Sequence, residues 1–231
     1  MEICIVHGSP RKKNTYAAVQ EVKKSLLCLG EVQFTEFYLQ EEQVEFCRGC
    51  FSCILGREKK CPHAETVQPI IEALLRADGV IFATPVYVLD MTAQMKAFFD
   101  HTGYFFMVHR PYPAFFQKPA WIISTAAGGG TKDTNRSVAR ILRYWGISRI
   151  FCTGISIYAM GWDEIPAERK QKLERQLQKT AGKFYRTLQK KPGASLRTRI
   201  LFAAMKRIQR KDSVDWCYWK EQGWLDGKKP F

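Results

Sequence analysis

Short apolar runs alternate with longer amphipathic stretches along most of this 231-residue chain, and this alternation constrains the fold more than any other feature. Patterns typical of strands occur at residues 3–6, 32–39, 80–83, 121–124 and 150–152. Between and after them, apolar side chains recur at helical spacing, as in the stripe of Val67, Ile70, Ile71 and Leu74. About five strand–helix repeats predict an α/β fold, with a parallel sheet and helices on both faces.

The last amphipathic stripe ends at the sequence KKPG, residues 190–193, which predicts a domain boundary. We therefore expect a domain over residues 1–190 and a C-terminal extension over residues 191–231. The net charge is +14, and residues 159–231 carry 18 Lys and Arg against 8 Asp and Glu. Such a basic surface can suit a membrane, a nucleic acid or an acidic redox partner, but a solvated helical tail explains it as well. No stretch matches a nucleic-acid-binding module, so we expect no nucleic-acid partner.

The distribution of apolar residues predicts a cytoplasmic protein with no membrane span. No apolar run approaches the roughly 20 residues needed to cross a bilayer. The first ten residues, MEICIVHGSP, lack the basic head and long apolar stretch of a signal peptide. In a reducing compartment structural disulfides are rare, so clustered cysteines favour metal ligands or redox thiols.

The connection after the first predicted strand, GSPRKKNT at residues 8–15, has the groups of a phosphate site. Ser9 and Thr15 provide hydroxyls, Asn14 an amide and Arg11 a guanidinium, and the following helix adds free backbone N–H groups. The loop lacks both G-x-G-x-x-G and the G-K-[ST] of a P-loop, which disfavours dinucleotide and nucleoside-triphosphate sites. A well-capped helix beside a basic loop is the simpler alternative.

Two further strand ends carry unusual sequences, and ligands of parallel sheets bind at the carboxyl ends of strands. TPVYV at residues 84–88 combines a bend at Pro85 with Tyr87, whose ring can lie beside a flat ligand. STAAGGGT at residues 124–131 contains three consecutive glycines, which allow a close backbone approach. An ordinary turn and a flexible loop would explain each segment alone. The three loops together predict one site for a ligand with a phosphate and a flat ring.

The segments GSPRKKNT, ATPVYVLDMTAQMKAFFDH and STAAGGGT resemble the three FMN-binding loops of flavodoxin-like NAD(P)H-dependent FMN reductases, over roughly residues 1–160. The resemblance implies a five-stranded sheet in the order 2-1-3-4-5, FMN as cofactor and NAD(P)H as co-substrate. It also implies a homodimer or homotetramer with the flavin near a subunit interface. One departure is Lys13, where many relatives have glycine. The FMN-binding residues that it implies are Ser9, Arg11, Asn14 and Thr15 at the phosphate, Pro85, Val86 and Tyr87 along the isoalloxazine, and Thr125, Gly128 and Gly129 closing on it.

Four of the eight cysteines lie in CRGCFSCILGREKKC, residues 47–61, within a predicted insertion at residues 41–63. The spacing of Cys47, Cys50, Cys53 and Cys61 is similar to the compact motif of the iron–sulfur flavoproteins, which implies a [4Fe–4S] cluster. Zinc more often uses two separated C-x2-C pairs. Related reductases can carry similar cysteines without a cluster, so both alternatives stay open.

Two functions follow from the resemblance. The first is an FMN-dependent enzyme that passes electrons from NAD(P)H to a small acceptor such as a quinone or a flavin; it needs no acid or base side chain, so no catalytic residue is assigned. The second is an iron–sulfur flavoprotein that carries electrons from ferredoxin and has no nicotinamide site. We expect His101 and His109 to be structural. The aromatic segment 104–116 is expected to cover the flavin, meet a partner subunit or cover the chain's own core.

Overall fold

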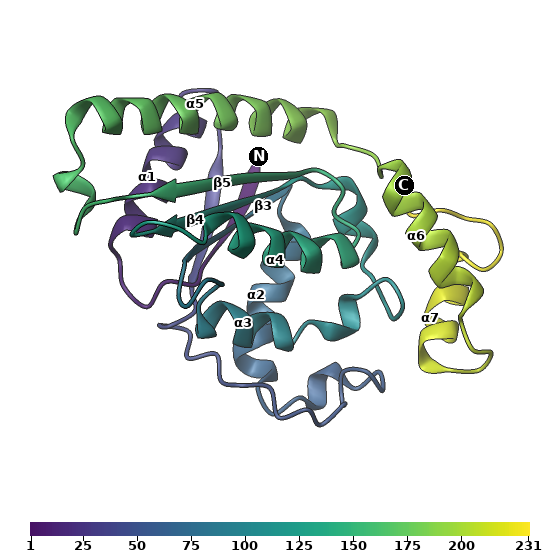
Figure 1. Ribbon diagram of the computed structural model, residues 1–231. Coiled ribbons are helices and arrows are strands. Elements are labelled where there is room, and N and C mark those ends of the chain that lie inside the picture. The colour runs from purple at the N-terminus through teal and green to yellow at the C-terminus, as the bar shows by residue number, and fades with distance from the viewer.

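The computed structural model describes residues 1–231 and contains one five-stranded sheet in the order β2-β1-β3-β4-β5 (Figure 1). Every neighbouring pair of strands is parallel. This result confirms the predicted flavodoxin-like topology. The strands are β1 (Glu2–His7), β2 (Gln33–Tyr38), β3 (Gly79–Pro85), β4 (Ala120–Ala126) and β5 (Ile150–Ser156).

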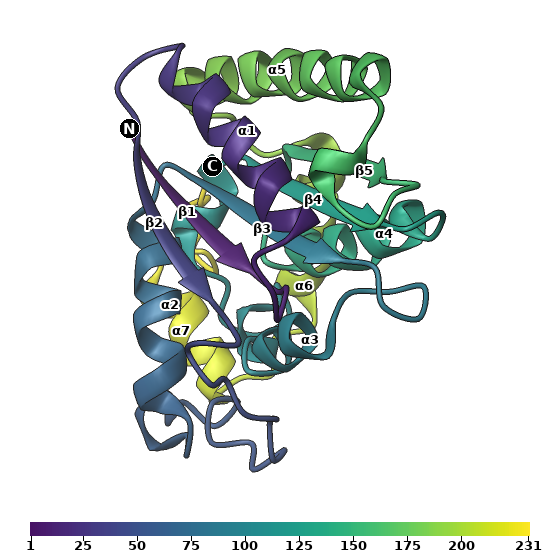
Figure 2. The ribbon, with the colours of Figure 1, turned by 90° about the vertical axis from the view of Figure 1, so that its left-hand side faces the viewer.

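Helices cover both faces of the sheet, as Figures 1 and 2 show. One face carries α1 (Asn14–Leu27) and α5 (Ala167–Lys190). The other face carries α2 (Ala64–Arg76), α3 (Ala93–Asp100) and α4 (Thr131–Tyr144). Parallel strands need such crossover helices, so both sides of the sheet become buried.

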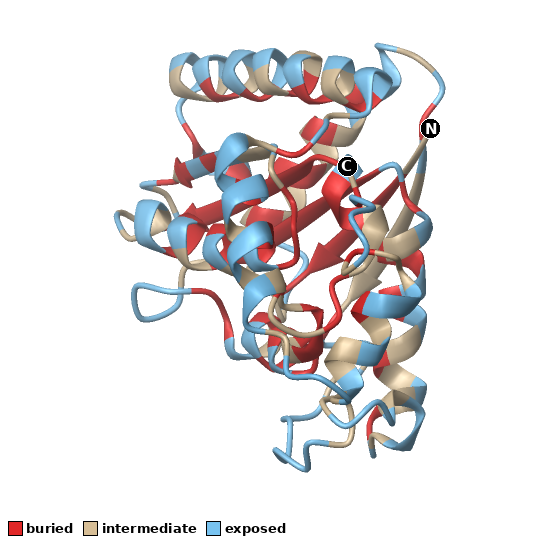
Figure 3. Ribbon diagram, turned by 90° about the vertical axis from the view of Figure 1, so that its right-hand side faces the viewer, coloured by how far each residue is buried: buried red, intermediate tan, exposed pale blue.

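Alternation along each strand divides the core into two layers. In β1, Ile3 and Ile5 pack with α1 and α5, whereas Cys4 and Val6 pack with α2 and α3. This division follows from the period of two in a strand, where successive side chains point to opposite faces. Figure 3 shows the buried residues concentrated along the sheet and the helix faces turned toward it.

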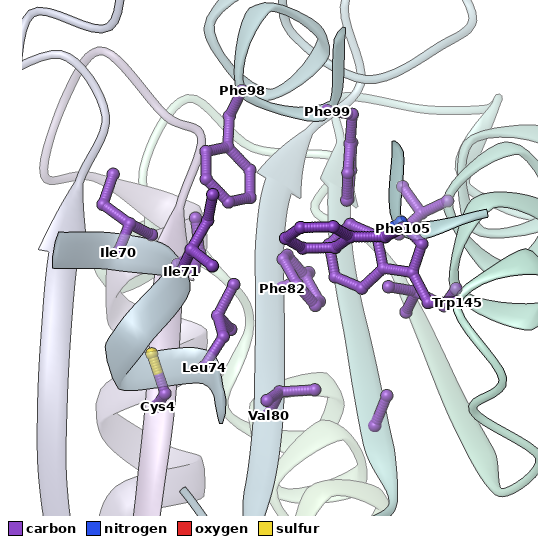
Figure 4. Packing of buried hydrophobic residues seen from close by; sticks show 14 of the residues in the cluster. Cys4, Ile70, Ile71, Leu74, Val80, Phe82, Phe98, Phe99, Phe105 and Trp145 are labelled. Atoms are coloured by element: carbon purple, nitrogen blue, oxygen red, sulfur yellow. The ribbon is translucent and has the colours of Figure 1, made fainter. Parts of the chain in front are cut away.

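Seven of the 25 buried residues in the layer between the sheet and α2, α3 and α4 are aromatic, and several of them lie together (Figure 4). The ring of Trp145 lies 6.0 Å from Phe82, 5.6 Å from Phe99 and 5.2 Å from Phe105, in edge-on contacts between ring centroids. Phe105 and Phe115 belong to the aromatic segment 104–116 and are fully buried here. The segment was expected to cover the flavin, to meet a partner subunit or to cover the chain's own core, and the structure shows the last of these.

The C-terminal extension contains α6 (Leu196–Arg207) and α7 (Val214–Glu221) and lies at the side of the sheet opposite to the arrowheads (Figure 1). Its Phe202, Trp219 and Trp224 form a small core with Met107 and Phe116. The division at residue 190 therefore stays a prediction, because the extension shares buried side chains with the preceding domain. No helix in the structure is long and apolar enough to cross a membrane.

Candidate flavin site

A cavity of about 310 Å³ lies at the edge where the parallel strands end, which is where such sheets bind ligands. The connections after β1, β3, β4 and β5 meet there. Eight of the ten predicted cofactor residues line this cavity, and Gly128 and Gly129 do not. The lining residues are Ser9, Arg11, Lys13, Asn14 and Thr15; Pro85, Val86 and Tyr87; Thr125, Ala126 and Ala127; and Ile157, Ala159 and Met160.

The connection between β1 and α1 leaves backbone donors free at one end of the cavity. Ser9 Oγ donates to Arg11 O at 2.6 Å and accepts from Arg11 N–H at 3.2 Å, which folds the loop back on itself. The N-cap, Lys13, supplies no side-chain oxygen to the helix. The N–H groups of Asn14 and Thr15 consequently have no intrahelical acceptor, and with the helix dipole they favour a bound phosphate. Lys13 has φ of −120°, so the departure from glycine there brings no left-handed strain.

The charge at this end of the cavity is positive. Arg11 and Lys13 are exposed and form none of the chain's ion pairs. Lys12 does not line the cavity; its Nζ lies 2.7 Å from Glu41 Oε1 and 4.1 Å from the ring centroid of Tyr38. No carboxylate lines the cavity. The electrostatics therefore suit an anionic group.

Two threonines join the loops to one another. The hydroxyls of Thr15 and Thr125 lie 2.6 Å apart, and both residues are buried. Thr92 caps α3 and also donates from Oγ1 to Gly8 O at 2.6 Å. A Cβ at Gly8 would lie 2.8 Å from Met95 Cβ, so only glycine fits between β1 and α3. These contacts fix the cationic end of the cavity to the carboxyl ends of two strands.

The connection after β3 ends in a strained two-residue turn. Val86 N–H donates to Thr125 O at 2.7 Å, and Tyr87 and Asp90 exchange backbone hydrogen bonds of 2.9 and 3.1 Å. Between them Val88 and Leu89 have φ of 48° and 66°, where turns prefer Asn or Gly. Such conformations cost about 1–3 kcal/mol each, and they concentrate at functional sites. Val88 is 99% exposed and Leu89 71%, so the turn presents apolar side chains at the rim of the cavity.

Gly130 is the residue of the glycine-rich loop at which a side chain would not fit. Its φ is 92°, and a Cβ there would lie 2.8 Å from Val86 Cγ1. The space beside Gly129 is open, and the nearest atom to a Cβ at Gly128 is 3.8 Å away, on Tyr158. The sequence pattern indicated a close backbone approach but did not identify the glycine that makes it.

The connection after β5 is a fourth wall that the three sequence motifs did not include. It contributes Ile157, Ala159 and Met160. Arg169 holds it by donating from Nη2 to Ser156 O at 2.6 Å, and its guanidinium lies 4.4 Å from the ring centroid of Tyr158. The predicted parallel sheet could have indicated this wall, because the carboxyl end of β5 lies at the same edge of the sheet as those of the other strands.

The family comparison agrees with this geometry. The family described as NADPH-dependent FMN reductase matches residues 1–153. The chain belongs to this family. It is thereby a flavin oxidoreductase in the broad sense of the FMN reductase family.

Curated relatives match nearly the whole chain. An iron–sulfur flavoprotein of Archaeoglobus fulgidus is 26% identical over 226 residues, which cover 94% of this chain and 97% of that protein. An iron–sulfur flavoprotein of Clostridioides difficile is 26% identical over 236 residues, covering 96% of this chain and 99% of that protein.

Solved structures share the fold at lower identity. The apo form of the NADH:FMN oxidoreductase EMOB superimposes with a TM-score of 0.58 at 18% identity, over 86% of this chain and 93% of that chain. An FMN-dependent NADH-azoreductase of Bacillus anthracis, in complex with FMN, gives a TM-score of 0.62 at 11% identity, over 80% of this chain and 99% of that chain.

The residues at the cavity fit the cofactor for which the FMN reductase family is named. FMN has one phosphate, and the cavity has one cationic end with free N–H groups and no carboxylate. FMN also has a flat tricyclic ring, and the opposite walls present Pro85, Val86, Tyr87 and Met160. The assignment of individual residues to FMN remains a prediction.

The cysteine-rich segment lies apart from this cavity, at the bottom of Figure 2 below α2 and α3. Cys47 and Cys50 are exposed, Cys53 and Cys61 are half-buried, and all four thiols are free. A hydrogen bond with Ser52 lowers the pKa of Cys50, whereas burial raises the pKa of Cys53. No three cysteine, histidine or carboxylate side chains are grouped closely enough to hold a metal ion. As arranged here, the four predicted ligands therefore do not fit a cluster.

A buried arginine, which the sequence motifs did not single out, holds this segment in place. The guanidinium of Arg110 donates to the backbone oxygens of Cys53 and Ile54, the latter at 3.0 Å from Nη1. It also pairs with Glu58 at 2.7 Å and with Asp215 of α7 at 3.1 Å. Arg110 thus connects the cysteine-rich segment to the C-terminal extension.

The two histidines expected to be structural both have specific partners. His109 Nδ1 lies 2.8 Å from Asp215 Oδ2, which adds a second contact to α7. His101 Nε2 lies 2.9 Å from Glu45 O, and its Nδ1 lies 4.0 Å from Cys61 Sγ. Burial lowers the pKa of His101, which favours its neutral form. Both contacts span long stretches of sequence, so the motifs could not reveal them.

Proposed function

We propose that this chain is an FMN-dependent oxidoreductase that takes electrons from NAD(P)H and passes them to a small acceptor such as a quinone or a flavin. The observation that carries the proposal is the cavity at the carboxyl edge of the sheet, with a cationic end free of carboxylates and an apolar wall beside it. Family membership supports the flavin part of the proposal. Two solved structures that share the fold, the NADH:FMN oxidoreductase and an NAD(P)H:quinone oxidoreductase of Methanothermobacter marburgensis, carry names that favour the nicotinamide donor and the quinone acceptor.

The chain's own groups have distinct roles in this proposal. Arg11, with Ser9, Asn14, Thr15 and the N–H groups of α1, binds the phosphate. Pro85, Val86 and Tyr87 lie along the flat ring. Thr125, Gly128 and Gly129 belong to the loop after β4, which closes on the flat ring. These ten residues are the proposed FMN contacts.

Bound FMN supplies the hydride and electron chemistry, so the protein's contribution is position and electrostatics. No acid or base lines the cavity apart from Arg11, Lys13 and Tyr87. The fixed backbone of the four loops orients the ring, and the apolar wall excludes water from one side of it. Neither task requires a proton to move on a side chain.

The rim of the cavity favours an oligomer. Val88, Leu89, Tyr158 and Met160 expose between 66% and 99% of their surface although their side chains are large and apolar. A cluster of exposed apolar side chains at a functional rim is typical of an interface. We propose a cytoplasmic homodimer or homotetramer in which a second copy covers this rim.

A second candidate is an electron carrier that receives electrons from ferredoxin through a [4Fe–4S] cluster on Cys47, Cys50, Cys53 and Cys61. The names of the curated relatives, iron–sulfur flavoproteins, favour it. Two of the thiols are exposed and the segment contains left-handed residues at Gly49, Phe51 and Gly56. In the arrangement shown here the thiols do not converge, so cluster binding requires the segment to adopt another conformation.

Anaerobic purification followed by spectroscopy tests both candidates. The denatured protein should release FMN and not FAD, and NADH or NADPH should bleach the flavin absorbance rapidly. A protein that fails to bind added FMN would contradict the proposal. Bleaching by reduced ferredoxin but not by NAD(P)H, together with about four irons per chain, would favour the second candidate.

A further inference from the structure

A second cavity, of about 340 Å³, is lined by residues of α4, of α6 and of the segment between α4 and β5. Helix α6 lies at the end of the sheet opposite to the arrowheads (Figure 1). Helix α4 follows the loop whose Ala126 and Ala127 line the flavin cavity, and it ends at Tyr144, which lines the second cavity. A 14-residue helix is about 20 Å long, so the two cavities are well separated. Nothing in the flavin chemistry uses the second cavity.

Three arginines dominate its charge. Arg140 and Arg143 come from the last turns of α4, and Arg197 from the first turn of α6. None of the three belongs to an ion pair, and no carboxylate is among the ten lining residues. All three side chains are exposed, and together they make the potential at the cavity positive, which favours an anionic ligand.

Hydroxyl groups form the floor of this cavity. Thr198, which is 5% exposed, lies with its Oγ1 2.8 Å from Ser148 Oγ and 3.0 Å from Ser195 Oγ. Two contacts among three hydroxyls use two of their three protons, so one proton remains to donate to a ligand. The N–H groups of Leu196 and Arg197 at the start of α6 also lack intrahelical acceptors.

The remaining wall is apolar. Ile200, Leu201 and Ala204 of α6 face it, and the ring of Tyr144 closes the other side. Ile200 is 62% exposed, whereas Tyr144 is 38% exposed and its ring also stacks on Phe106 at 5.1 Å between centroids. A ligand that fills the cavity therefore meets cations and donors on one part and hydrocarbon on the other.

We propose that this cavity is a second binding site, for a small amphipathic anion that carries a phosphate or carboxylate on an apolar group. The arginines and the α6 N-terminus bind the anion, and the wall of Ile200, Leu201 and Tyr144 binds the apolar part. The volume of about 340 Å³ lies within the range of about 300–1,000 Å³ for small-molecule sites. The site does not depend on the reaction at the flavin.

Isothermal titration calorimetry on the full chain saturated with FMN tests this site, since the bound flavin phosphate keeps other anions out of the first cavity. Phenyl phosphate should bind at least about tenfold more tightly than inorganic phosphate, and benzyl alcohol should give no measurable binding. Phenylacetate in place of phenyl phosphate shows whether a carboxylate serves as well as a phosphate.

Arg143→Gln should weaken phenyl phosphate binding by about tenfold or more, because one charge-assisted contact is lost. Arg149→Gln is the matched control, since Arg149 is an exposed arginine nearby that does not line the cavity. Equal losses in both variants, or equal binding of phenyl phosphate and inorganic phosphate, would overturn the proposal. A change of oligomeric state in Arg143→Gln without any binding by the wild type would instead make the cavity a subunit contact.

Discussion

At the scale of single residues, Arg11 and Lys12 are adjacent but have different surroundings. Arg11 lines the flavin cavity, whereas the ammonium of Lys12 pairs with Glu41. We expect Arg11→Ala to weaken FMN binding by about 1.5–3 kcal/mol, through loss of a charge-assisted contact. Fluorescence titration of apo-protein with FMN measures this loss. Lys12→Ala is the control and should change the affinity little; the reverse order of effects would mean that the loop binds phosphate differently.

Glu36 on β2 makes folding stability depend on pH. The hydrogen bond from His7, with a further one from Lys23, lowers the pKa of Glu36 from 4.5 to about 2 despite partial burial. A carboxyl with a lowered folded-state pKa stabilises the fold above the unfolded pKa, and this contribution is lost as pH falls from 4.5 toward 2. Water screens this partly exposed pair, so the contribution at neutral pH is on the order of 1–2 kcal/mol.

Urea unfolding of wild type and Glu36→Gln between pH 3 and pH 6 checks this assignment. The wild type should be more stable at pH 6, and the difference in unfolding free energy should shrink as pH falls. A difference that stays constant with pH would show that Glu36 contributes through packing alone.

Local sequence predicts residues that line one cavity when they are close along the chain, but it does not reveal contacts between distant segments. Arg11 and Thr15 were predicted because a phosphate loop and its helix N-terminus are contiguous in sequence. The partners of Arg110 are Glu58 and Asp215, separated from it by 52 and 105 residues, so no motif contains them. The sequence could not show which of the three glycines is required, because Val86, which a side chain at Gly130 would meet, lies in the loop after another strand.

At the scale of elements, the periodicities predicted the strands and helices of the domain well. Helices cover both faces of this sheet, so its central strands have continuous apolar sequences that are easy to recognise. The turn at Val88 and Leu89 could not be predicted, because neither residue favours positive φ. Contacts from distant segments hold the loop around this turn, such as Val86 N–H to Thr125 O at 2.7 Å and Ser137 Oγ to Asp90 Oδ2 at 3.2 Å.

The cysteine-rich segment depends on Arg110 for its position. Removing the guanidinium in Arg110→Gln takes away the donors for the backbone oxygens of Cys53 and Ile54. We expect the segment to loosen and the half-buried Cys53 to react with a thiol reagent about five- to tenfold faster, since exposure also lowers its raised pKa. The rate at the exposed Cys50 should change little.

Mass spectrometry of partially alkylated protein resolves the two cysteines. Arg57→Gln is the matched control, because Arg57 is exposed in the same segment and forms no ion pair. Unchanged reactivity of Cys53 in Arg110→Gln would mean that the segment holds its shape without the arginine.

At the scale of the whole molecule, the C-terminal extension is joined to the rest of the chain by a small aromatic core. Phe202 stacks on Trp219 at 4.7 Å, and Trp219 meets Trp224 edge-on at 5.1 Å between ring centroids. Met107 and Phe116 of the preceding domain complete this cluster. Composition marked the extension as basic and separate, but buried contacts of this kind depend on tertiary packing that a charge pattern does not encode.

Trp219→Ala tests whether the extension and the flavodoxin-like domain unfold as one unit. Trp219 is fully buried, and its Nε1 donates to His109 O at 2.6 Å, so its loss should cost about 3–5 kcal/mol. Denaturant unfolding of FMN-loaded protein, followed by both tryptophan fluorescence and flavin absorbance, measures the loss. If the two parts share one core, both probes should shift together to lower denaturant. Trp216→Ala is the control on the same helix, since Trp216 is only partly buried and outside the cluster, and it should change the midpoint little. A flavin transition that stays at its wild-type midpoint while the fluorescence transition moves would show instead that residues 191–231 unfold independently of the flavin site.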